Sequence, residues 1–287
     1  MSKIIVITGP TASGKSAFAI KLAKKYNGEI ICADSRTVYK DLNIGTAKPT
    51  KQDQKEIKHY LLDIMTINQN FSVYDFKKAA EIATGQIYSK NRLPIVVGGS
   101  GLYIDALLFD YKFRNPRKHP DENLDNKTLN QLTELAKNKY PNEINKIDIK
   151  NRRRVEQLLL KGPAKDEDRK KLKRDALIIC LNPETALLKQ NIATRLDAML
   201  DKGFIQEVEK LRAKFGKENS LLATTGYLRI SEYLDKKIDT QTMKKLIIKD
   251  SVDLARKQRA WFRRNPHIKW VSSFDQADKL VAQFIKS

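Results

Sequence analysis

Cysteine is scarce in this chain of 287 residues, which contains only Cys32 and Cys180. Two cysteines cannot build a disulfide framework or a CxxC metal site, so the sequence is typical of a reducing compartment and we expect a cytoplasmic protein. Histidine is also rare, with three residues, and none has a partner at metal-ligand spacing. We therefore predict no histidine-based metal site.

Long apolar runs are missing as well. None approaches the roughly 20 residues that a membrane span requires. The apolar run at residues 4–7 is too short for a signal peptide and indicates a strand instead. We expect no association with membranes. The hydrophobic content of 41% still suffices for a buried core, and the length fits one large domain, with or without an insertion.

Acidic residues are heavily outnumbered by basic ones. The chain has 55 lysines and arginines against 34 aspartates and glutamates, a formal net charge of +21. Such a balance favours a polyanionic partner, because lysine and arginine release counterions from phosphate chains. A generally lysine-rich proteome would give the same total. The clustering of the basic residues therefore decides between the two interpretations.

Apolar, β-branched runs alternate with amphipathic segments along the chain. The runs predict strands at residues 3–8, 29–33, 59–64, 93–97, 176–181 and 268–271. Helical spacing predicts helices at residues 17–25, 73–90, 102–108, 184–215, 225–234 and 240–264, and one more at the C-terminus. This alternation indicates an α/β fold with a parallel sheet flanked by helices.

The composition changes near residue 113. Residues 114–127 are polar and rich in proline and asparagine, and helical patterns follow at residues 129–140 and 147–161. A charged connector over residues 161–174 leads back to the strand-like pattern. We predict a small helical domain, residues 113–172, inserted into a catalytic core of residues 1–112 and 173–287 that includes the C-terminal helices.

The most informative motif follows the first predicted strand. The segment matches G-x-x-x-x-G-K-[ST], the P-loop, through Gly9, Pro10, Thr11, Ala12, Ser13, Gly14, Lys15 and Ser16. Backbone N–H groups of such a loop and of the helix after it cradle phosphate oxygens. Lys15 adds a positive charge, and the Ser16 hydroxyl is a ligand for Mg²⁺. The motif predicts a bound di- or triphosphate but leaves the reaction open.

Two further loops follow strands of the predicted sheet. Asp34 comes after the second strand, and Ser100 lies in the Gly-Gly-Ser-Gly segment of residues 98–101 after the fourth. Loops at the carboxyl ends of parallel strands gather around the ligand, so Asp34 is a candidate metal ligand or general base. The glycines allow close approach to a ligand. A capping aspartate and a tight turn are the structural alternatives.

Basic residues cluster in two places. One is the Lys-Asn-Arg-Arg-Arg segment of residues 150–154. The other is a stripe within about 80° of one face of the helix predicted at residues 240–264, about 27 Å long, formed by Lys245, Lys249, Arg256, Arg259 and Arg263. A solvated face normally mixes in acids, and this stripe contains none, which favours contact with a phosphate backbone.

Several motifs together resemble the tRNA dimethylallyltransferase (tRNA isopentenyltransferase) family over most of the chain. Residues 9–16 are similar to its GPTASGK[ST] loop, and residues 34–50 to its more specific DSRxVYxxxxIGTAKP segment. Other similar segments lie at residues 59–64, 71–76, 94–103, 195–203, 226–227 and 255–263. The eukaryotic zinc finger has no counterpart here, so the resemblance is to the bacterial type.

The resemblance implies a P-loop NTPase-like core and a reaction. The dimethylallyl group of dimethylallyl diphosphate would pass to the exocyclic N6 amine of the adenosine 3′-adjacent to the anticodon, in tRNAs that read U-starting codons. The product would be N6-isopentenyladenosine. Residues 9–16 would bind the diphosphate leaving group, with Mg²⁺ on Ser16. Lys15 and Arg195 would stabilise its charge, Asp34 would accept the amine proton, and Ser100 stands where the family has a substrate-contacting threonine.

The same resemblance implies a tRNA anticodon stem-loop as partner of a monomeric enzyme, with the target adenosine flipped out of its stack. The implied tRNA contacts are Asp34, Ser35, Arg36, Thr37, Ser100, Lys150, Asn151, Arg152, Arg153, Arg154, Arg256, Arg259 and Arg263, and the helical insertion would grip the stem. The chain departs from the family in its short insertion, where the position of a usual arginine falls near Glu122. It also has Val252 and Asp253 where arginine and glutamine are common.

Two other functions remain open at this stage. A P-loop small-molecule kinase would share the strand, the loop and the helix, with Asp34 as base for an alcohol. It would require ATP and would not explain the basic stripe. A non-catalytic RNA-binding protein would explain the charge but not the intact set of Lys15, Ser16 and Asp34.

Overall fold

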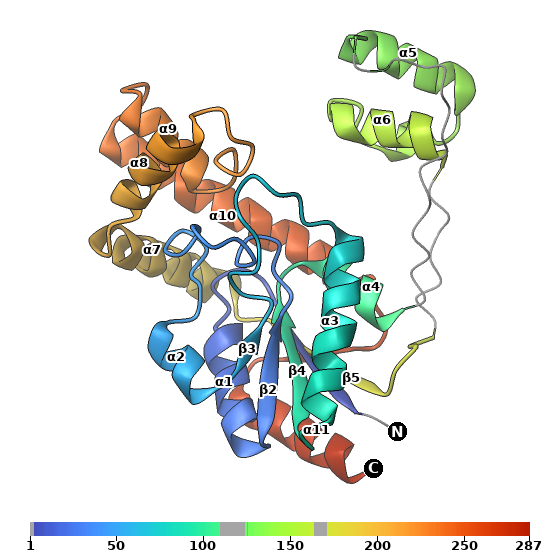
Figure 1. Cartoon of the computed structure of the whole chain (residues 1–287), viewed down its shortest axis with the longest axis vertical. Helices are drawn as coiled ribbons and strands as arrows, with labels where there is room; N and C mark the ends of the chain where they lie inside the picture. The colour runs from blue at the N-terminus through green and yellow to red at the C-terminus, as the bar shows by residue number, and fades with distance from the viewer. Residues whose placement is uncertain (1–2, 110–123, 125, 164–170) are drawn as a thin grey trace. The chain divides into compact units, whose positions relative to one another are not determined.

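A parallel sheet forms the centre of the computed structural model, which describes residues 3–109, 124, 126–163 and 171–287 (Figure 1). Within those residues the sheet has six strands in the order β3-β2-β4-β1-β5-β6. The strands are β1 (Ile4–Thr8), β2 (Gly28–Cys32), β3 (His59–Tyr60), β4 (Leu93–Gly98), β5 (Ala176–Leu181) and β6 (Ile268–Val271). Since every pairing is parallel, all strands end at the same edge. The predicted fold class is confirmed.

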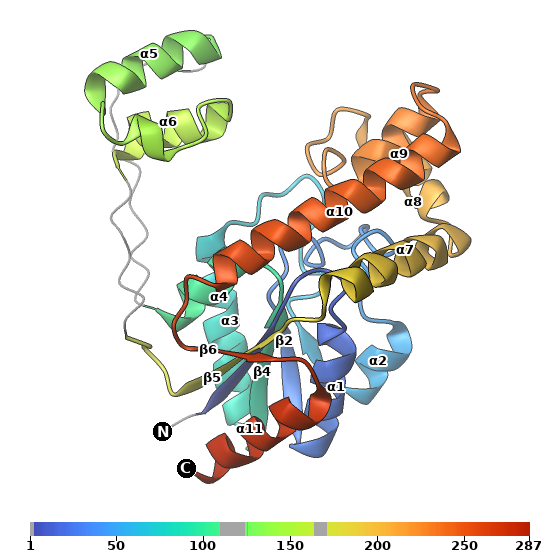
Figure 2. The same cartoon turned by 180° about the vertical axis from the view of Figure 1, so that it is seen from behind.

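Both faces of the sheet are covered by helices, as the two opposite views show (Figures 1 and 2). Successive residues of β1 explain this arrangement, because strand side chains alternate between faces. Ile5 and Ile7 pack with α1 (Lys15–Lys25) and α11 (Phe274–Lys286), whereas Ile4 and Val6 pack with α3 (Val73–Tyr88) and α4 (Gly101–Leu108). All five residues of β1 are buried.

A helical lobe follows β5 in the chain. It consists of α7 (Thr185–Asp201), α8 (Phe204–Phe215), α9 (Tyr227–Leu234) and α10 (Thr240–Phe262). Its core includes Leu196, Phe204 and Tyr227, and it also takes in Tyr39 and Leu42 from the segment that follows β2. The long α10 contacts both α7 and α9 and extends to α4 (Figure 2). The lobe therefore fixes the segment after β2 next to the carboxyl edge of the sheet.

The chain divides into two compact units, residues 1–110 with 169–287, and residues 111–168. The second unit contains α5 (Leu129–Lys139), a 3₁₀ turn (Ile144–Lys146) and α6 (Arg152–Lys161), around its own core of Leu132, Ala136, Val155, Leu158 and others. Arg152 stabilises this unit internally, because its guanidinium donates to Glu156 and to the backbone carbonyls of Leu124 and Lys127. The boundary predicted at residue 113, and residues 164–170 of the connector, lie outside the described residues.

Four local predictions differ from the structure. The third strand ends at Tyr60, because Leu61 and Asp63 adopt positive φ angles of 60° and 55° and turn the chain away from the sheet. The helix predicted from residue 147 begins at Arg152, where the Asn151 side chain caps it. The helix predicted over 184–215 breaks in two near residue 202, and an unpredicted helix, α2 (Lys51–Glu56), starts at a capping box.

No helix among the described residues is long and apolar enough to cross a membrane.

Candidate active site

The P-loop lies between β1 and α1, as its sequence predicts. Gly14 precedes the first turn of α1 with φ +83°, a left-handed conformation that favours glycine. No side chain of the described residues caps this helix, so its first N–H groups are available to an anion. Lys15 and Ser16 follow directly and both line a cavity. The loop thus has the local geometry of an anion site.

The cavity has a volume of about 590 Å³ and lies where β1, β2 and β4 end. Its polar lining includes Lys15, Ser16, Asp34, Ser35, Arg36, Thr37, Ser100, Arg195 and Gln258. An apolar wall faces these groups and comes from α7 and α10, through Ile192, Leu196, Met199, Ile247 and Leu254. The site residues predicted around the sheet edge are therefore brought together in one cavity of the first unit.

Three cationic side chains, Lys15, Arg36 and Arg195, line this cavity, and burial shifts the pKa of two of them. Burial, helped by repulsion from Arg195, lowers the pKa of Lys15 to about 8, and attraction to Asp34 opposes the shift. Burial also lowers the pKa of Arg195, again opposed by Asp34. Arg195 projects from α7 and donates from Nη1 to Thr11 Oγ1 at 3.4 Å. Three cationic side chains against the one carboxylate of the lining make the cavity a site for an anion.

Asp34 is held by its own turn. Its Oδ1 accepts the backbone N–H groups of Arg36 at 2.8 Å and Thr37 at 3.3 Å. The Ser100 hydroxyl lies across from this turn and accepts the Ser35 N–H at 3.2 Å. The Thr37 hydroxyl is buried and has no hydrogen-bond partner within the described part of the chain. A carboxylate and an unsatisfied hydroxyl thus line the same cavity.

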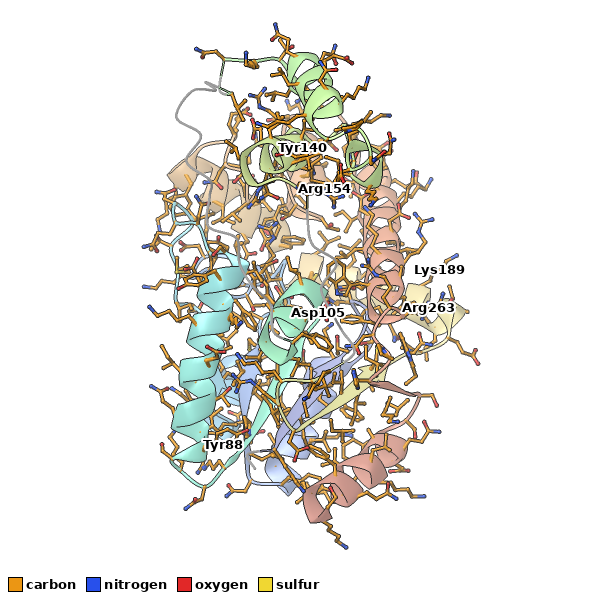
Figure 3. The ribbon with its side chains drawn as sticks, turned by 90° about the vertical axis from the view of Figure 1, so that its right-hand side faces the viewer. Tyr88, Asp105, Tyr140, Arg154, Lys189 and Arg263 are labelled. Atoms are coloured by element: carbon orange, nitrogen blue, oxygen red, sulfur yellow. The ribbon has the colours of Figure 1, made fainter. Side chains whose placement is uncertain are left out.

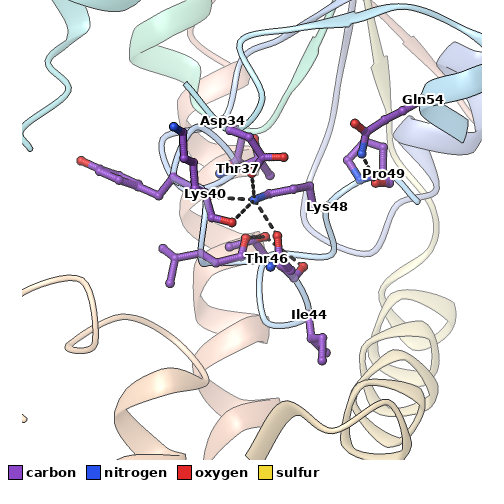
Figure 4. A network of polar contacts seen from close by, with 12 residues as sticks. Asp34, Thr37, Lys40, Ile44, Thr46, Lys48, Pro49 and Gln54 are labelled. Atoms are coloured by element: carbon purple, nitrogen blue, oxygen red, sulfur yellow. Dashed lines mark hydrogen bonds and ion pairs between the residues drawn. The ribbon is translucent and has the colours of Figure 1, made fainter. Parts of the chain in front are cut away.

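The segment after Asp34 is held by a buried lysine (Figure 4). Lys48 Nζ donates to the Tyr39 carbonyl at 2.8 Å, to Asn43 Oδ1 at 2.9 Å and to Asp63 Oδ1 at 2.5 Å, and its side chain is only 5% exposed. Removing one partner of such a pair leaves an uncompensated charge. Lys48 therefore fixes the course of residues 39–48. The only feature of the sequence that pointed to Lys48 was its place in the IGTAKP motif.

A glutamate from the helical lobe holds the same segment from the other side. Glu207 of α8 accepts the N–H groups of Asn43, Ile44 and Gly45 at 2.8–3.1 Å. It also accepts the Tyr227 hydroxyl at 2.8 Å, and together with burial this raises the pKa of Tyr227. Sequence reasoning missed Glu207, because nothing in its local pattern distinguishes it from the exposed Glu209 two residues later.

The basic residues of α10 fall into different environments. Arg256 and Arg263 are exposed, and Figure 3 shows Arg263 at the C-terminal end of the helix. Arg256 pairs with Asp253 at 3.1 Å, so this stretch does include an acid. Arg259 donates to the Pro183 carbonyl and, at 3.0 Å, to Thr185 Oγ1. Its guanidinium thus binds the protein's own oxygens.

The basic segment at residues 150–154 lies in the second unit. Lys150, Arg153 and Arg154 are exposed, and Figure 3 labels Arg154 on α6. Asn151 accepts the Arg154 N–H at 3.3 Å as the cap of α6. The exposed members of this segment are accordingly available to solvent, whereas Arg152 is used within the unit.

The donor set for a metal is small. No group of three or more histidine, cysteine, aspartate or glutamate side chains that could hold a metal ion occurs in the described residues. Ser16 is exposed and lines the cavity beside Lys15. A single hydroxyl fits a Mg²⁺ ion that takes its other oxygen ligands from phosphate and water, as Mg²⁺ commonly does.

Comparisons with known proteins show which family the chain resembles. The family model described as IPP transferase matches residues 37–265. The tRNA dimethylallyltransferase of Aster yellows witches'-broom phytoplasma is 38% identical over 92% of this chain and 90% of its own length. That of Acetivibrio thermocellus is 36% identical over 98% of this chain and 96% of its own.

Solved structures with a similar fold include transferases that act on tRNA. The crystal structure of tRNA delta(2)-isopentenylpyrophosphate transferase from Staphylococcus epidermidis has a TM-score of 0.76 and 32% identity, with both chains covered completely. A eukaryotic dimethylallyltransferase acting on tRNA has a TM-score of 0.79 at 24% identity, over 99% of this chain and 77% of its own, which shows the shared fold alone.

The cavity and the fold define a P-loop transferase. The chain belongs to the IPP transferase family. The predicted family is confirmed, and the findings support the prenyltransferase over the small-molecule kinase.

Proposed function

We propose that this chain transfers the dimethylallyl group of dimethylallyl diphosphate to the N6 amine of an adenosine in tRNA, the residue 3′-adjacent to the anticodon in tRNAs that read U-starting codons. The product is N6-isopentenyladenosine. One observation carries the proposal: Lys15, Arg195 and Asp34 line a single cavity that also has an apolar wall. This arrangement supplies cations for a leaving diphosphate, an acceptor for a proton and a surface for an isoprenoid chain.

The diphosphate end consists of residues 9–16 and Arg195. As the bond between C1 of the allyl group and the bridging oxygen breaks, both electrons leave with the diphosphate. Lys15, Arg195 and the free N–H groups at the start of α1 stabilise the charge that develops there. Because burial has removed much of the water from Lys15 and Arg195, their attraction for that charge is stronger than at an exposed surface.

The acceptor end consists of Asp34 and Ser100. The N6 lone pair forms the new bond to C1, and the amine then loses a proton, which Asp34 accepts. The hydrogen bonds from the Arg36 and Thr37 N–H groups to Oδ1 orient the carboxylate. Ser100, and the buried hydroxyl of Thr37, are hydrogen-bonding groups for the adenosine. A base inside this cavity has left its stack.

The apolar wall suits the dimethylallyl group. Ile192, Leu196 and Met199 belong to α7, and Ile247 belongs to α10. Their side chains shield a carbon centre from water while it carries positive charge, which suppresses hydrolysis in favour of attack by the amine.

Mg²⁺ is the metal that the Ser16 hydroxyl fits. Bound there with diphosphate oxygens, it would add positive charge at the leaving group.

The exposed basic residues are the proposed contacts with RNA phosphates. The exposed side chains are those of Arg256 in α10, Arg263 at its C-cap, and Lys150, Arg153 and Arg154 in the second unit. We assign the second unit, predicted as residues 113–172, to the grip on the anticodon stem. We further propose that the enzyme is a monomer and acts in the cytoplasm, where its tRNA substrate is found.

The test uses radiolabelled dimethylallyl diphosphate, Mg²⁺ and no ATP. The acceptor is an unmodified anticodon stem-loop RNA with three adenosines after the anticodon. We expect label in this RNA and none in a matched RNA with guanosine at the 3′-adjacent position. ATP consumption on small alcohols without label in RNA would instead identify a kinase. Tight RNA binding without either activity would identify a binding protein.

A further inference from the structure

One side chain links the two ends of the cavity. Gln258 of α10 accepts the Thr11 N–H on Oε1 at 2.8 Å and donates from Nε2 to the Gly99 carbonyl at 3.1 Å. Because Thr11 offers a donor and Gly99 an acceptor, only one orientation of the amide satisfies both bonds. The two partners are 247 and 159 residues away from Gln258 in the chain.

The partners of Gln258 belong to the two functional loops. Thr11 lies in the diphosphate loop, and its hydroxyl accepts the bond from Arg195. Gly99 directly precedes Ser100, whose hydroxyl accepts the Ser35 N–H beside Asp34. Hydrogen bonds and the short stretches of backbone between them therefore connect the cationic end of the cavity, through Gln258, to the carboxylate end.

The packing of α10 against the second loop is close. A Cβ at Gly99 would overlap the Gln258 amide, so the backbone approaches this side chain as nearly as glycine permits. One turn later, Trp261 packs in the same way against Gly101 and donates from Nε1 to the buried Asp105 at 2.9 Å. The last turns of α10 thus pack closely against residues 99–105. Of the two α10 side chains in this contact, Gln258 and Trp261, Gln258 also binds the P-loop, through the Thr11 N–H.

We propose that Gln258 is a positioning residue, which sets the distance between the diphosphate and the acceptor amine by tying the P-loop to the Gly99–Ser100 backbone. The proposal rests on the proposed function for its kinetic consequence. It does not make Gln258 a contact of the reacting atoms. Thr8 Oγ1 already joins the two strand ends through the Gly98 carbonyl at 2.9 Å, so the strands stay paired without Gln258. Gln258 acts on the loop tips, where the substrates meet.

Two variants separate its two hydrogen bonds. Gln258→Met keeps the length of the side chain and loses both bonds. We expect kcat for transfer to fall about 10- to 100-fold, because a displacement on the order of 1 Å costs about 10²-fold in rate. The KM for dimethylallyl diphosphate, the affinity for stem-loop RNA and the melting temperature should change little, since water can replace the lost partners.

Gln258→Glu keeps the acceptor for Thr11 but places an oxygen against the Gly99 carbonyl. A protonated carboxyl would again donate to that carbonyl, so the ratio of the activity of this variant to that of wild type should rise as the pH falls. The matched control is Gln241→Met, which alters an exposed glutamine on the same helix.

A second measurement needs no turnover. The exchange of the Thr11 amide with D₂O, followed by ¹⁵N-resolved NMR, should be at least fivefold faster in Gln258→Met than in wild type or Gln241→Met. If the wild-type protein transferred no label to RNA, the proposed function would fail. The exchange rate of the Thr11 amide would still test whether Gln258 holds the P-loop. Wild-type kcat in Gln258→Met, or a Thr11 exchange rate equal to that of wild type, would overturn the proposal.

Discussion

Ser100 at the end of β4 accepts the backbone N–H of Ser35, across 3.2 Å, and this bond joins two loops that are 65 residues apart. Ser35 directly follows Asp34, so the contact fixes the carboxylate relative to the Gly-Gly-Ser-Gly segment. It arises because β2 and β4 are neighbours in the sheet and end side by side. The contact gives the proposed base a defined position within the cavity.

Asp34→Asn should abolish most of the transfer while leaving RNA binding intact. The asparagine oxygen can still accept the Arg36 and Thr37 N–H groups, so the turn is retained, but the side chain no longer accepts a proton. We expect the single-turnover rate to fall at least about 10²-fold and the stem-loop affinity to stay within about threefold. Asp201→Asn, at an exposed position at the end of α7, serves as the control. Wild-type turnover in Asp34→Asn would remove the base assignment.

Binding of pyrophosphate should weaken as the pH rises through about 8, the pKa of Lys15 in the free protein. Below that pH the ammonium is already charged. Above that pH the Lys15 amine is neutral in the free protein. A bound anion raises the pKa of Lys15, so binding requires Lys15 to take up a proton. This uptake lowers the affinity by up to about tenfold per pH unit. Calorimetry at pH 7, 8 and 9 in two buffers of different ionisation enthalpy measures this uptake.

Lys15→Arg provides the reference for that experiment, because a guanidinium stays charged over the whole range. The titration of pyrophosphate itself is common to both proteins and cancels in the comparison. We expect wild type to take up more protons than Lys15→Arg at pH 9, with only a small difference at pH 7. Equal pH dependence in the two proteins would contradict the assignment of Lys15.

Glu207→Gln should destabilise the protein more than its small change in shape suggests. The carboxylate accepts three backbone N–H groups and the Tyr227 hydroxyl. A glutamine turns an NH₂ group toward some of these donors, at a cost of about 2–3 kcal/mol in the free energy of unfolding. Urea unfolding measures the loss. Glu209→Gln, at an exposed position of the same helix, should stay within about 0.5 kcal/mol, and equal effects at the two positions would refute the role of Glu207.

Arg259 and Arg263 should respond differently to the same substitution. Arg259→Met removes the bonds to Pro183 and Thr185 and should lower the melting temperature. Arg263→Met should leave stability unchanged, weaken RNA binding and reduce the slope of log K against log [salt] by about one. Thermal unfolding and stem-loop binding at several salt concentrations measure both. If Arg259→Met reduced the salt slope and Arg263→Met did not, Arg259 would be the RNA contact and the role given to Arg263 would be wrong.

The P-loop and most of the strands show where sequence reasoning succeeds. The P-loop, every strand of the central sheet except the third, and α10 were predicted to within a few residues, because each is set by neighbours in the chain. The third strand was predicted too long, since the apolar pattern of residues 59–64 carries no sign of the positive φ angles at Leu61 and Asp63. A backbone conformation of that kind depends on the surroundings of the turn, not on hydrophobic periodicity.

The basic stripe shows what helical periodicity does not determine. Helical spacing placed Arg259 and Arg263 on one face; Arg259 lies in α10, and Arg263 is the C-cap residue that follows it. Periodicity does not indicate what lies opposite each side chain. Pro183 and Thr185, at the start of α7, accept hydrogen bonds from the Arg259 guanidinium, whereas the Arg263 side chain is exposed.

The sequence by itself determined the phosphate loop, the parallel sheet and the family, because these depend on contiguous motifs whose residues act through local backbone geometry. Only the tertiary structure decided how Asp34, Lys15 and Arg195 face one cavity and which groups hold them there. The structure alone shows the contacts of Gln258 and Glu207, whose partners are distant in the chain. It also shows that the Lys48 side chain is buried against nearby oxygens. Such contacts are fixed by the packing of helices and strands, and no periodicity along the chain records them.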